Sequence, residues 1–126
     1  MVDELAAAET TRDITEAALV AARASLAETD RAIKDLGARG VQMFTNVAGK
    51  PLDNPEFGPI FEMMHDYDLP VWMHPTRPAS HSDYPKVENR SHYDIWWLFG
   101  WPYETSAAMA RMVFSGFFDR WPNLKI

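Results

Sequence analysis

The 126-residue sequence contains no cysteine, and this absence excludes several kinds of chemistry. Without thiols the chain can form no disulfide, no thiolate metal site and no cysteine nucleophile. The stability of its fold must therefore come from packing. A reducing compartment is compatible with this composition.

The sequence also lacks an excess of basic residues and any long apolar run. Twelve lysine and arginine residues stand against eighteen aspartate and glutamate residues, which leaves a net charge of −6. This balance argues against a protein that neutralises nucleic-acid phosphates or an anionic membrane surface. No stretch approaches the roughly 18 consecutive apolar residues of a membrane span, and the N-terminus has no signal-peptide pattern. We expect a soluble, cytoplasmic protein with no nucleic-acid partner and no membrane partner.

Residues 1–36 contain no proline, no glycine and no aromatic residue, unlike the rest of the chain. Apolar residues in this segment recur at the three- and four-residue spacing of an amphipathic helix, namely Leu19, Ala22, Leu26, Ile33 and Leu36, with Thr29 as the one polar interruption. Gly37 can take the left-handed conformation that closes a helix, so we predict a helix that ends there. Its start is ambiguous, because Thr11, Asp13 and Thr15 could each cap it.

Residues 37–126 alternate between short apolar runs and helical patterns. The predicted elements are a buried strand at 41–45, a helix at 59–67, a strand at 69–73, a helix at 102–121 and the start of a strand at 124–126. The irregular stretch 76–100 carries a short helix near 93–98 and is expected to be mobile or poorly packed. Alternating strands and helices are typical of parallel β-α units, so the predicted fold class is α/β. We treat residues 1–126 as one domain, with a helical segment at 1–36 and β-α units at 37–126.

Several motifs of phosphate-binding and hydrolytic sites are missing. The six glycines form no GxGxxG pattern and no Gly-Lys-Ser or Gly-Lys-Thr, so the backbone arrangements that cradle phosphates are not indicated. No GxSxG sequence occurs, which leaves a Ser-His-Asp hydrolase without support. The four histidines include no HxH or HxxxH pair, so local sequence alone assembles no metal site.

Two polar residues lie at the carboxyl ends of the predicted strands, where ligands gather in parallel α/β folds. Asn46 follows the first strand, and His74 ends the second, directly before Pro75. A histidine in this position could present one imidazole nitrogen to a metal ion, or it could close the strand by a hydrogen bond to a loop. The spacing alone leaves both interpretations open.

The remaining candidates also admit a structural and a functional interpretation. Arg77 could clamp a carboxylate or form a surface salt bridge, and Glu104 could complement the dipole of its helix. His65, His81 and His92 are more typical of surface or helix-end positions than of a site. A dense aromatic cluster beside the long loop is typical of packing but could also stack on a substrate; it comprises Trp96, Trp97, Phe99, Trp101 and Tyr103.

Four segments carry a family resemblance: LGARGVQ at 36–42, VWMHP at 71–75, GWPYET at 100–105 and FDRWPNLKI at 118–126. In order and spacing they resemble the amidohydrolase-related proteins grouped with aminocarboxymuconate-semialdehyde decarboxylase and γ-resorcylate decarboxylase. The resemblance implies a (β/α)8 barrel, one divalent metal ion (zinc or manganese) and nonoxidative removal of carboxylate groups. The histidine of the His-Pro motif ligates the metal in that family, so the resemblance implies that His74 is a metal ligand.

Other parts of the family pattern have no counterpart in this sequence, including the first-strand ligand pair, the catalytic histidine and the late aspartate ligand. A whole barrel takes about 250 residues, so we interpret the chain as a partial (β/α)8 TIM-barrel fragment. Its expected function is that of a fragment of a metal-dependent carboxy-lyase. The alternatives are a hydrolase of the same superfamily and a non-catalytic barrel fragment, so whether this chain is an enzyme stays open.

The resemblance and the positions together define the expected site. His74 is the expected metal ligand, and Asn46, Arg77 and Trp101 are expected to contact a small-molecule carboxylate substrate. No catalytic residue is expected within the chain. We expect it to bind divalent metal weakly, because a catalytic zinc site normally takes three protein ligands. A complete barrel would cover Trp96, Trp97 and Trp101, and a partial barrel lacks part of that cover, so we expect an exposed apolar patch and self-association.

Overall fold

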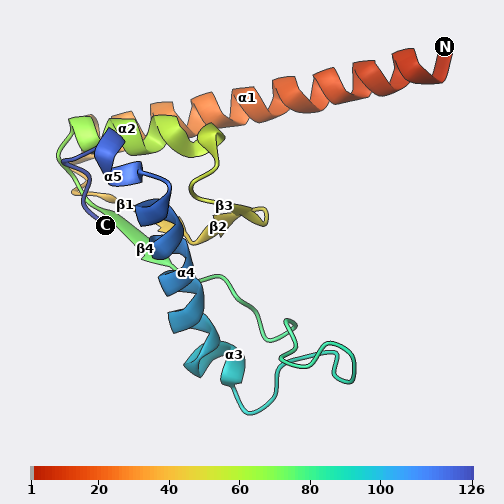
Figure 1. Cartoon of the computed structure of the whole chain (residues 1–126). Coiled ribbons are helices and arrows are strands. Elements are labelled where there is room, and N and C mark those ends of the chain that lie inside the picture. Colours follow the sequence, from red (N-terminus) through yellow and green to blue (C-terminus); the bar gives the residue numbers. More distant parts are fainter. Residues whose placement is uncertain (1) are drawn as a thin grey trace. The chain divides into compact units, whose positions relative to one another are not determined.

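The structure is a computed structural model that describes the backbone of residues 2–126 and the side chains of residues 18–126. The chain divides into two units at the boundary between Ala38 and Arg39. The first unit contains α1 (Val2–Leu36). The second unit, labelled in Figure 1, contains β1 (Val41–Phe44), β2 (Asn46–Val47), β3 (Lys50–Pro51), η1 (Pro55–Phe57), α2 (Gly58–Asp66), β4 (Val71–His74), α3 (Ile95–Leu98), α4 (Gly100–Phe114) and α5 (Phe117–Arg120).

The end of α1 is the one that the sequence predicts. Gly37 follows the last helical residue with a φ of 70°, and the amide of Ala38 donates to the carbonyl oxygen of Ala32 at 2.9 Å. A left-handed glycine thus turns the chain out of the helix and satisfies one of its last carbonyls. The helix begins at Val2, so the three possible caps lie inside it and their assignment is wrong: Thr11, Asp13 and Thr15.

The predicted parallel sheet is confirmed in the second unit. Strands β1 and β4 pair in parallel, in a register that runs from Val41 opposite Val71 to Phe44 opposite His74. Helix α2 connects them, which makes a β-α-β unit of the α/β class. On the other side of β4, Pro70 forms a parallel bridge with Lys125, and the amide of Val71 donates to the Lys125 carbonyl at 2.9 Å. The predicted start of a strand at 124–126 therefore lies beside β4.

The first strand differs from its prediction in burial. We expected a buried strand at 41–45, but Gln42 and Phe44 are exposed, and 52% of the Phe44 side chain is accessible. Successive strand residues point to opposite faces, and Gln42 and Phe44 share the face that the second unit leaves uncovered. An antiparallel hairpin of β2 and β3, which the sequence analysis did not predict, follows directly and pairs Asn46 with Pro51.

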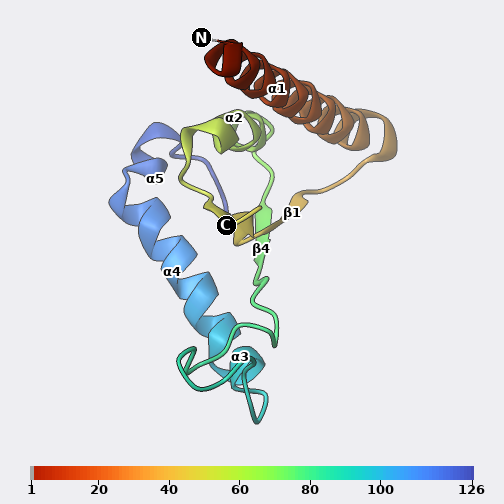
Figure 2. The same ribbon diagram turned by 90° about the vertical axis from the view of Figure 1, so that its right-hand side faces the viewer.

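The predicted helix at 102–121 is two helices, α4 and α5. Gly116 interrupts it with a φ of 71°, and the amide of Ser115 donates to the carbonyl of Arg111 at 2.9 Å as α4 ends. A left-handed residue cannot continue a right-handed helix, so the chain turns before α5 begins at Phe117. Figure 2 shows α2, α5 and α4 following one another on one side of the two strands.

The core of the second unit lies between these helices and the sheet. The rings of Phe61 and Phe117 meet edge to face at 4.7 Å, and both side chains are almost fully buried. The other buried apolar residues come from the turn after β3, α2, β4, α4 and the C-terminal segment: Leu52, Met64, Val71, Ala108, Met112 and Leu124. Within the described residues, no helix has the length and apolar character needed to cross a membrane.

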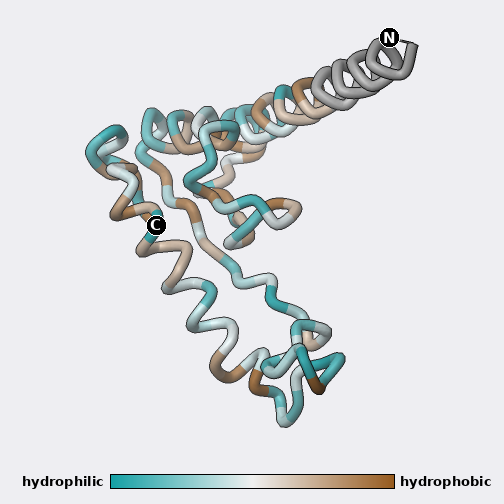
Figure 3. The backbone as a smooth tube through the Cα atoms, turned by 45° about the vertical axis from the view of Figure 1, so that its right-hand side comes forward, coloured by the Kyte–Doolittle hydropathy of each residue, from teal (hydrophilic) through white to brown (hydrophobic). Residues whose placement is uncertain are grey.

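The long segment between β4 and α4 contains the predicted short helix, observed as α3. Figures 1 and 2 agree that this segment and α3 lie together at the end of the unit away from α2 and α5. Figure 3 shows mostly hydrophilic colours along the loop and hydrophobic ones at α3. The expectation of poor packing is wrong for part of the loop, because Ser91 is only 2% exposed. Its hydroxyl donates to the Asp83 carboxylate and accepts the amide of Trp96 at 3.0 Å.

Candidate functional site

The carboxyl ends of β1 and β4 lie side by side, and both predicted strand-end residues are found there. The parallel register places Phe44 opposite His74, and the amide of Thr45 donates to the carbonyl of His74 at 3.0 Å. Asn46 follows as the first residue of β2. The sheet edge therefore brings the backbone of Asn46 and His74 together, as expected for parallel strands.

Glu104, on the first turns of α4, joins three segments of this edge. One carboxylate oxygen, Oε2, accepts the amides of Thr76 and Arg77, each at 2.8 Å. The other, Oε1, accepts the Thr76 hydroxyl at 3.0 Å and the side-chain amide of Asn46 at 3.1 Å. The side chain of Asn46 also donates to the Thr76 hydroxyl oxygen at 2.6 Å. One carboxylate thus fastens the segment after β4 and the end of β1 to α4.

The surroundings of Glu104 favour its ionised form. Burial by itself raises the pKa of Glu104, but the amide hydrogen bonds from Arg77 and Thr76 and the hydroxyl hydrogen bond from Thr76 act in the opposite direction. Their net effect holds the pKa of Glu104 below its ordinary value of 4.5. A carboxylate charge is therefore a permanent part of this edge near neutral pH.

The ring of His74 is oriented by its own neighbour. Its Nδ1 atom lies 2.7 Å from the carbonyl oxygen of Pro75, and a carbonyl can only accept a hydrogen bond, so Nδ1 carries the proton. In the neutral ring this leaves a lone pair on Nε2. The ring is further held by edge contacts with Phe44 at 5.8 Å and Trp101 at 5.4 Å between centroids. Such an imidazole can offer Nε2 to a metal ion or to a hydrogen-bond donor.

Arg77 lies at the same edge, but its side chain is already engaged. Its guanidinium contacts the Asp83 carboxylate at 3.2 Å, and its carbonyl accepts the indole N–H of Trp101 at 3.0 Å. With its amide bound to Glu104, the residue connects the start of the long loop to α4 at two points, Glu104 and Trp101, while its guanidinium pairs within the loop. For Arg77 to clamp a substrate carboxylate, it would have to release Asp83.

Trp101 is the centre of the aromatic cluster. Its ring makes edge contacts with Trp96 at 5.6 Å and with Trp97 at 6.2 Å, as well as with His74. Phe99 and Tyr103, which the sequence places in the cluster, are each 70% exposed. A hollow of about 550 Å³ lies on the exposed side of this cluster and is lined by Pro75, Trp97, Leu98, Trp101, Pro102, Thr105 and Ser106. This hollow can take an apolar or aromatic group, and Trp101, which lines it, contacts the ring of His74.

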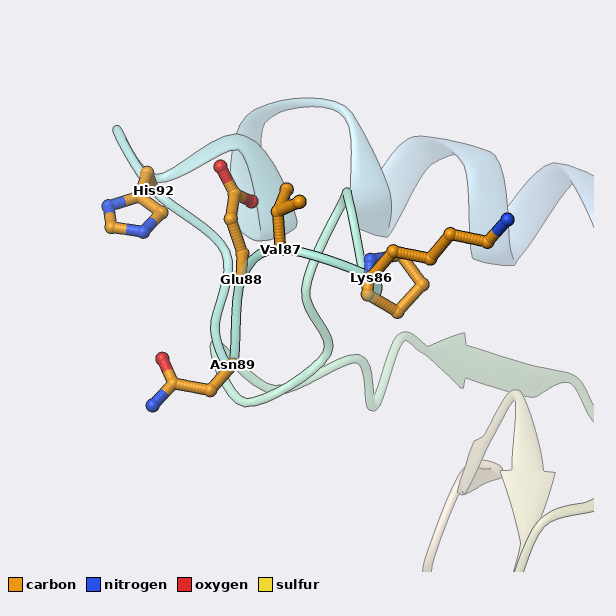
Figure 4. A pocket seen from close by; sticks show the side chains of 6 residues that line it. Lys86, Val87, Glu88, Asn89 and His92 are labelled. Carbon is orange, nitrogen blue, oxygen red and sulfur yellow. The ribbon is translucent and has the colours of Figure 1, made fainter.

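The other three histidines lie elsewhere. His65 is in the last turn of α2, where its Nδ1 atom accepts the amide of Asn123 at 3.2 Å. His81 and His92 are exposed in the long loop. His92 lines an open hollow, and Figure 4 shows that its ring, the Glu88 carboxylate and the Lys86 ammonium point in different directions. These side chains do not converge on a common point, so they form no site.

His74 can supply one ligand of a metal site, and the part of the chain with described side chains supplies no complete site. No group of three or more His, Cys, Asp or Glu residues within 18–126 could hold a metal ion. Both carboxylate oxygens of Glu104 accept hydrogen bonds from other groups of the chain. The donor set therefore fits one position of a metal centre.

The role of Glu104 differs from the one that its sequence position predicts. That position predicts a favourable interaction with the helix dipole, whereas in the structure Glu104 accepts hydrogen bonds from Asn46, Thr76 and Arg77. A signal was present, because a glutamate on the first turns of a helix that follows a parallel strand can reach the carboxyl end of that strand. Its partners, however, lie 27 to 58 positions away in sequence, and periodicity carries no information about them.

Comparison with known proteins gives consistent results. The amidohydrolase family model matches residues 2–126. Over 102 residues the chain is 39% identical to 2-amino-3-carboxymuconate-6-semialdehyde decarboxylase of Dictyostelium discoideum, covering 81% of this chain and 27% of that protein. Over 109 residues it is 30% identical to decarboxylase orsB of Emericella nidulans, covering 82% of this chain and 32% of that protein.

A solved structure shows the same likeness in three dimensions. The chain superposes on 5-carboxyvanillate decarboxylase LigW of Sphingomonas paucimobilis with a TM-score of 0.63 and 30% sequence identity. The match covers 80% of this chain and 29% of that one. The chain thus spans between a quarter and a third of the length of the relatives that it matches.

Proposed function

The chain belongs to the amidohydrolase family, and from this premise we propose that it forms part of a metal-dependent carboxy-lyase, which removes a carboxylate group without oxidation. Its named relatives are decarboxylases in two curated sequences and in one solved structure. The observation that carries the proposal is the ring of His74, whose Nδ1 proton is bound to the Pro75 carbonyl so that Nε2 is available as a ligand. A hydrolase of the same family and a non-catalytic fragment remain as outcomes of the test.

The β1-α2-β4 unit is proposed to be a segment of a (β/α)8 barrel. Parallel pairing of β1 and β4, with a further parallel bridge at Lys125, is the arrangement that successive barrel strands adopt. In barrels of this kind the active site lies at the carboxyl ends of the strands. His74 and Asn46 lie at that end.

The proposed cofactor is one divalent metal ion, zinc or manganese, with His74 as one of its ligands. Such an ion, when bound, would polarise the substrate and stabilise negative charge that develops during loss of the carboxylate. The chain offers one ligand where a catalytic zinc site normally takes three, so we expect it to bind the metal weakly by itself. Other polypeptide segments would supply the remaining ligands and the proton donor.

The proposed substrate is a small molecule that carries a carboxylate, with an aromatic or unsaturated body. The hollow beside Trp97 and Trp101 supports this assignment, because two aromatic side chains line it and one of them, Trp101, contacts the His74 ring. Trp101 is therefore proposed to contact the substrate body. Asn46 and Arg77 are proposed as substrate contacts only if they exchange the partners they now hold, Glu104 and Asp83.

The most direct test places the residues of this chain in the complete barrel of a related enzyme. The matching segment of the Dictyostelium enzyme would be replaced by the corresponding residues of this chain, and the chimera would be assayed for bound metal and for CO2 release from the substrate of that enzyme. We expect stoichiometric metal and measurable CO2 release, and His74→Ala should lose both. His81→Ala, at an exposed loop histidine, is the matched control and should keep both.

Two outcomes would overturn the proposal. A folded, metal-loaded chimera that releases no CO2 would show that this segment does not support decarboxylation. If it instead hydrolysed amide or ester substrates, the hydrolase alternative would replace the carboxy-lyase.

A further inference from the structure

A single peptide group lies between Glu104 and His74. The carbonyl oxygen of Pro75 accepts the Nδ1 proton of His74 at 2.7 Å, and the amide of Thr76 donates to Oε2 of Glu104 at 2.8 Å. This carbonyl and this amide belong to the same peptide bond, which is planar. The two hydrogen bonds are therefore made by the two ends of one rigid unit.

The charge of Glu104 reaches His74 through this unit. A hydrogen bond from an amide to an ionised carboxylate is stronger than one to a neutral acceptor, and it polarises the peptide group that makes it. The polarised carbonyl of Pro75 becomes a better acceptor for the Nδ1 proton of His74. Metal-binding histidines are commonly held by a carboxylate or a carbonyl on the nitrogen that does not bind the metal. Here the Pro75 carbonyl contacts the histidine, and the amide of the same peptide group is bound by the Glu104 carboxylate.

The position of the peptide is fixed independently of His74. Glu104 also accepts the amide of Arg77 and the side chains of Thr76 and Asn46, so the carboxylate cannot turn away without losing several hydrogen bonds. Gly100 and Trp101 precede Glu104 on the same helix, and the indole of Trp101 both touches the His74 ring and donates to the Arg77 carbonyl. Helix α4 thus contacts both the ring, through Trp101, and its peptide partner, through Glu104.

We propose that Glu104 is a positioning residue that fixes the tautomer and the orientation of His74 through the Pro75–Thr76 peptide. In this arrangement the Nδ1 proton is held on the peptide side, and Nε2 is kept unprotonated for a ligand. That the ligand is a metal ion rests on the proposed function, whereas the effect of Glu104 on the tautomer does not. One experiment can therefore contradict the effect of Glu104 on the tautomer without contradicting the metal-ligand role of His74, and the reverse.

The chain carries its own reference for the measurement. The Nδ1 atom of His65 accepts the amide of Asn123, so its neutral ring must carry the proton on Nε2. Nitrogen-15 NMR of the imidazole rings distinguishes the two tautomers directly. The spectra are recorded at alkaline pH, and the neutral form of each ring is verified from its own nitrogen shifts. We expect His74 and His65 to give opposite tautomers in one spectrum of the metal-free full chain, with His74→Gln identifying the signals of His74.

The variant Glu104→Gln tests the role of the charge with little change of shape. We expect the ratio of the Nδ1–H to the Nε2–H form of His74 to fall by about threefold or more, because a neutral acceptor polarises the peptide less. The tautomer of His65 should not change. Glu56→Gln, which removes a carboxylate that pairs with Lys50 on the surface, is the matched control and should leave both rings unchanged.

Three results would overturn the proposal. The first is a wild-type His74 that carries its proton on Nε2, a result that does not depend on whether any variant folds. The second is a folded Glu104→Gln chain whose His74 tautomer ratio equals that of wild type, which would make Glu104 only a structural anchor. The third concerns Thr76→Val, which keeps the amide but removes the hydroxyl. A change of the His74 tautomer in that variant as large as in Glu104→Gln would place the coupling in the hydroxyl and not in the peptide.

Discussion

Gly100 and the side chain of Arg77 pack so closely that a Cβ atom at position 100 would lie 2.5 Å from Cδ of Arg77. The arginine cannot move away freely, because its guanidinium pairs with Asp83 and its amide is bound to Glu104. The absence of a side chain at position 100 therefore lets the long loop and the start of α4 close on each other.

Gly100→Ala should destabilise the protein even though alanine is the better helix former. We expect a loss of about 1 to 2 kcal/mol in the free energy of unfolding, because the new methyl group must push Arg77 from its place. Chemical denaturation measures this loss. Gly58 is the matched control, since it also begins a helix but a Cβ there would lie 3.6 Å from the nearest atom, on Trp121. Gly58→Ala should be neutral or slightly stabilising.

A second substitution identifies the cause. In an Arg77→Ala background the methyl group at position 100 meets no obstacle, so Gly100→Ala should cost almost nothing. An equal loss in both backgrounds would mean that the close contact with Arg77 is not the reason for the effect.

The helices and strands that could be predicted from the sequence are those whose pattern is contained in a few neighbouring residues. The end of α1 at Gly37 and the parallel strands after it were predicted because a left-handed glycine and short apolar runs are features of a few neighbouring residues. The break at Gly116 was missed because the apolar pattern continues across it, from Met112 to Phe117. The exposed side of β1 was missed because burial depends on which elements cover a face, and a strand's own residues do not contain that information.

The candidate site was predictable in its positions and not in its contacts. Parallel topology alone brings Asn46 and His74 to one edge. The partners of Arg77 and Glu104 come from loops and turns whose course depends on the whole unit. The positive charge of Arg77 predicts a contact with a substrate carboxylate, but in the structure its guanidinium pairs with a carboxylate of the chain itself, that of Asp83.

The stability of the chain should depend on the ionisation of Glu104. Its pKa is lower in the folded chain than its ordinary value of 4.5, so ionised Glu104 stabilises the fold above that value. The contribution is lost as the pH falls from about 4.5 through the folded pKa. We expect Glu104→Gln to be less stable than wild type at pH 7 and the difference to shrink below pH 4.5, as measured by denaturation at a series of pH values.

Glu28 provides the comparison for this titration. Its pKa is also lowered, by the hydrogen bond and charge of Arg31, but its side chain is 62% exposed on α1. Glu28→Gln should therefore change the pH dependence far less than Glu104→Gln. An equal effect of the two substitutions would contradict the assignment of Glu104 as the anchor of the site edge.

Two phenylalanines three positions apart should differ widely in their contribution to stability. Phe117 is 2% exposed and packs against Phe61, whereas Phe114, at the end of α4, is 87% exposed. Phe117→Ala should lower the free energy of unfolding by about 3 to 5 kcal/mol, and Phe114→Ala should change it by about 0.5 kcal/mol or less. Similar losses in denaturant titrations of the two variants would mean that the core is not where the structure places it.

The exposed apolar residues at the end of the long loop should make the chain self-associate. Trp97, Leu98 and Phe99 are 49%, 54% and 70% exposed and follow one another in sequence. Because such a patch gains free energy when it leaves water, we expect the sedimentation coefficient to rise with protein concentration. Leu98→Lys should shift the chain toward the monomer, while Val87→Lys, at an isolated exposed residue of the same loop, should not. A monomer over a wide concentration range in the wild type would exclude this prediction.

The chain by itself should bind divalent metal weakly and show no decarboxylase activity. A single imidazole nitrogen at His74 is far from the three protein ligands that a catalytic zinc ion normally takes, and no cluster among residues 18–126 adds the others. We expect less than one equivalent of zinc or manganese after incubation with excess metal and desalting, as measured by elemental analysis. His74→Ala should lower even this amount, whereas His92→Ala, at an exposed loop position, should leave it unchanged.

Without the ion, positioning by α4 and the aromatic cluster leaves the charge that develops on the substrate unstabilised, so no CO2 should be released. One equivalent of tightly held metal, together with turnover that His74→Ala abolishes, would show that this segment holds a complete active site.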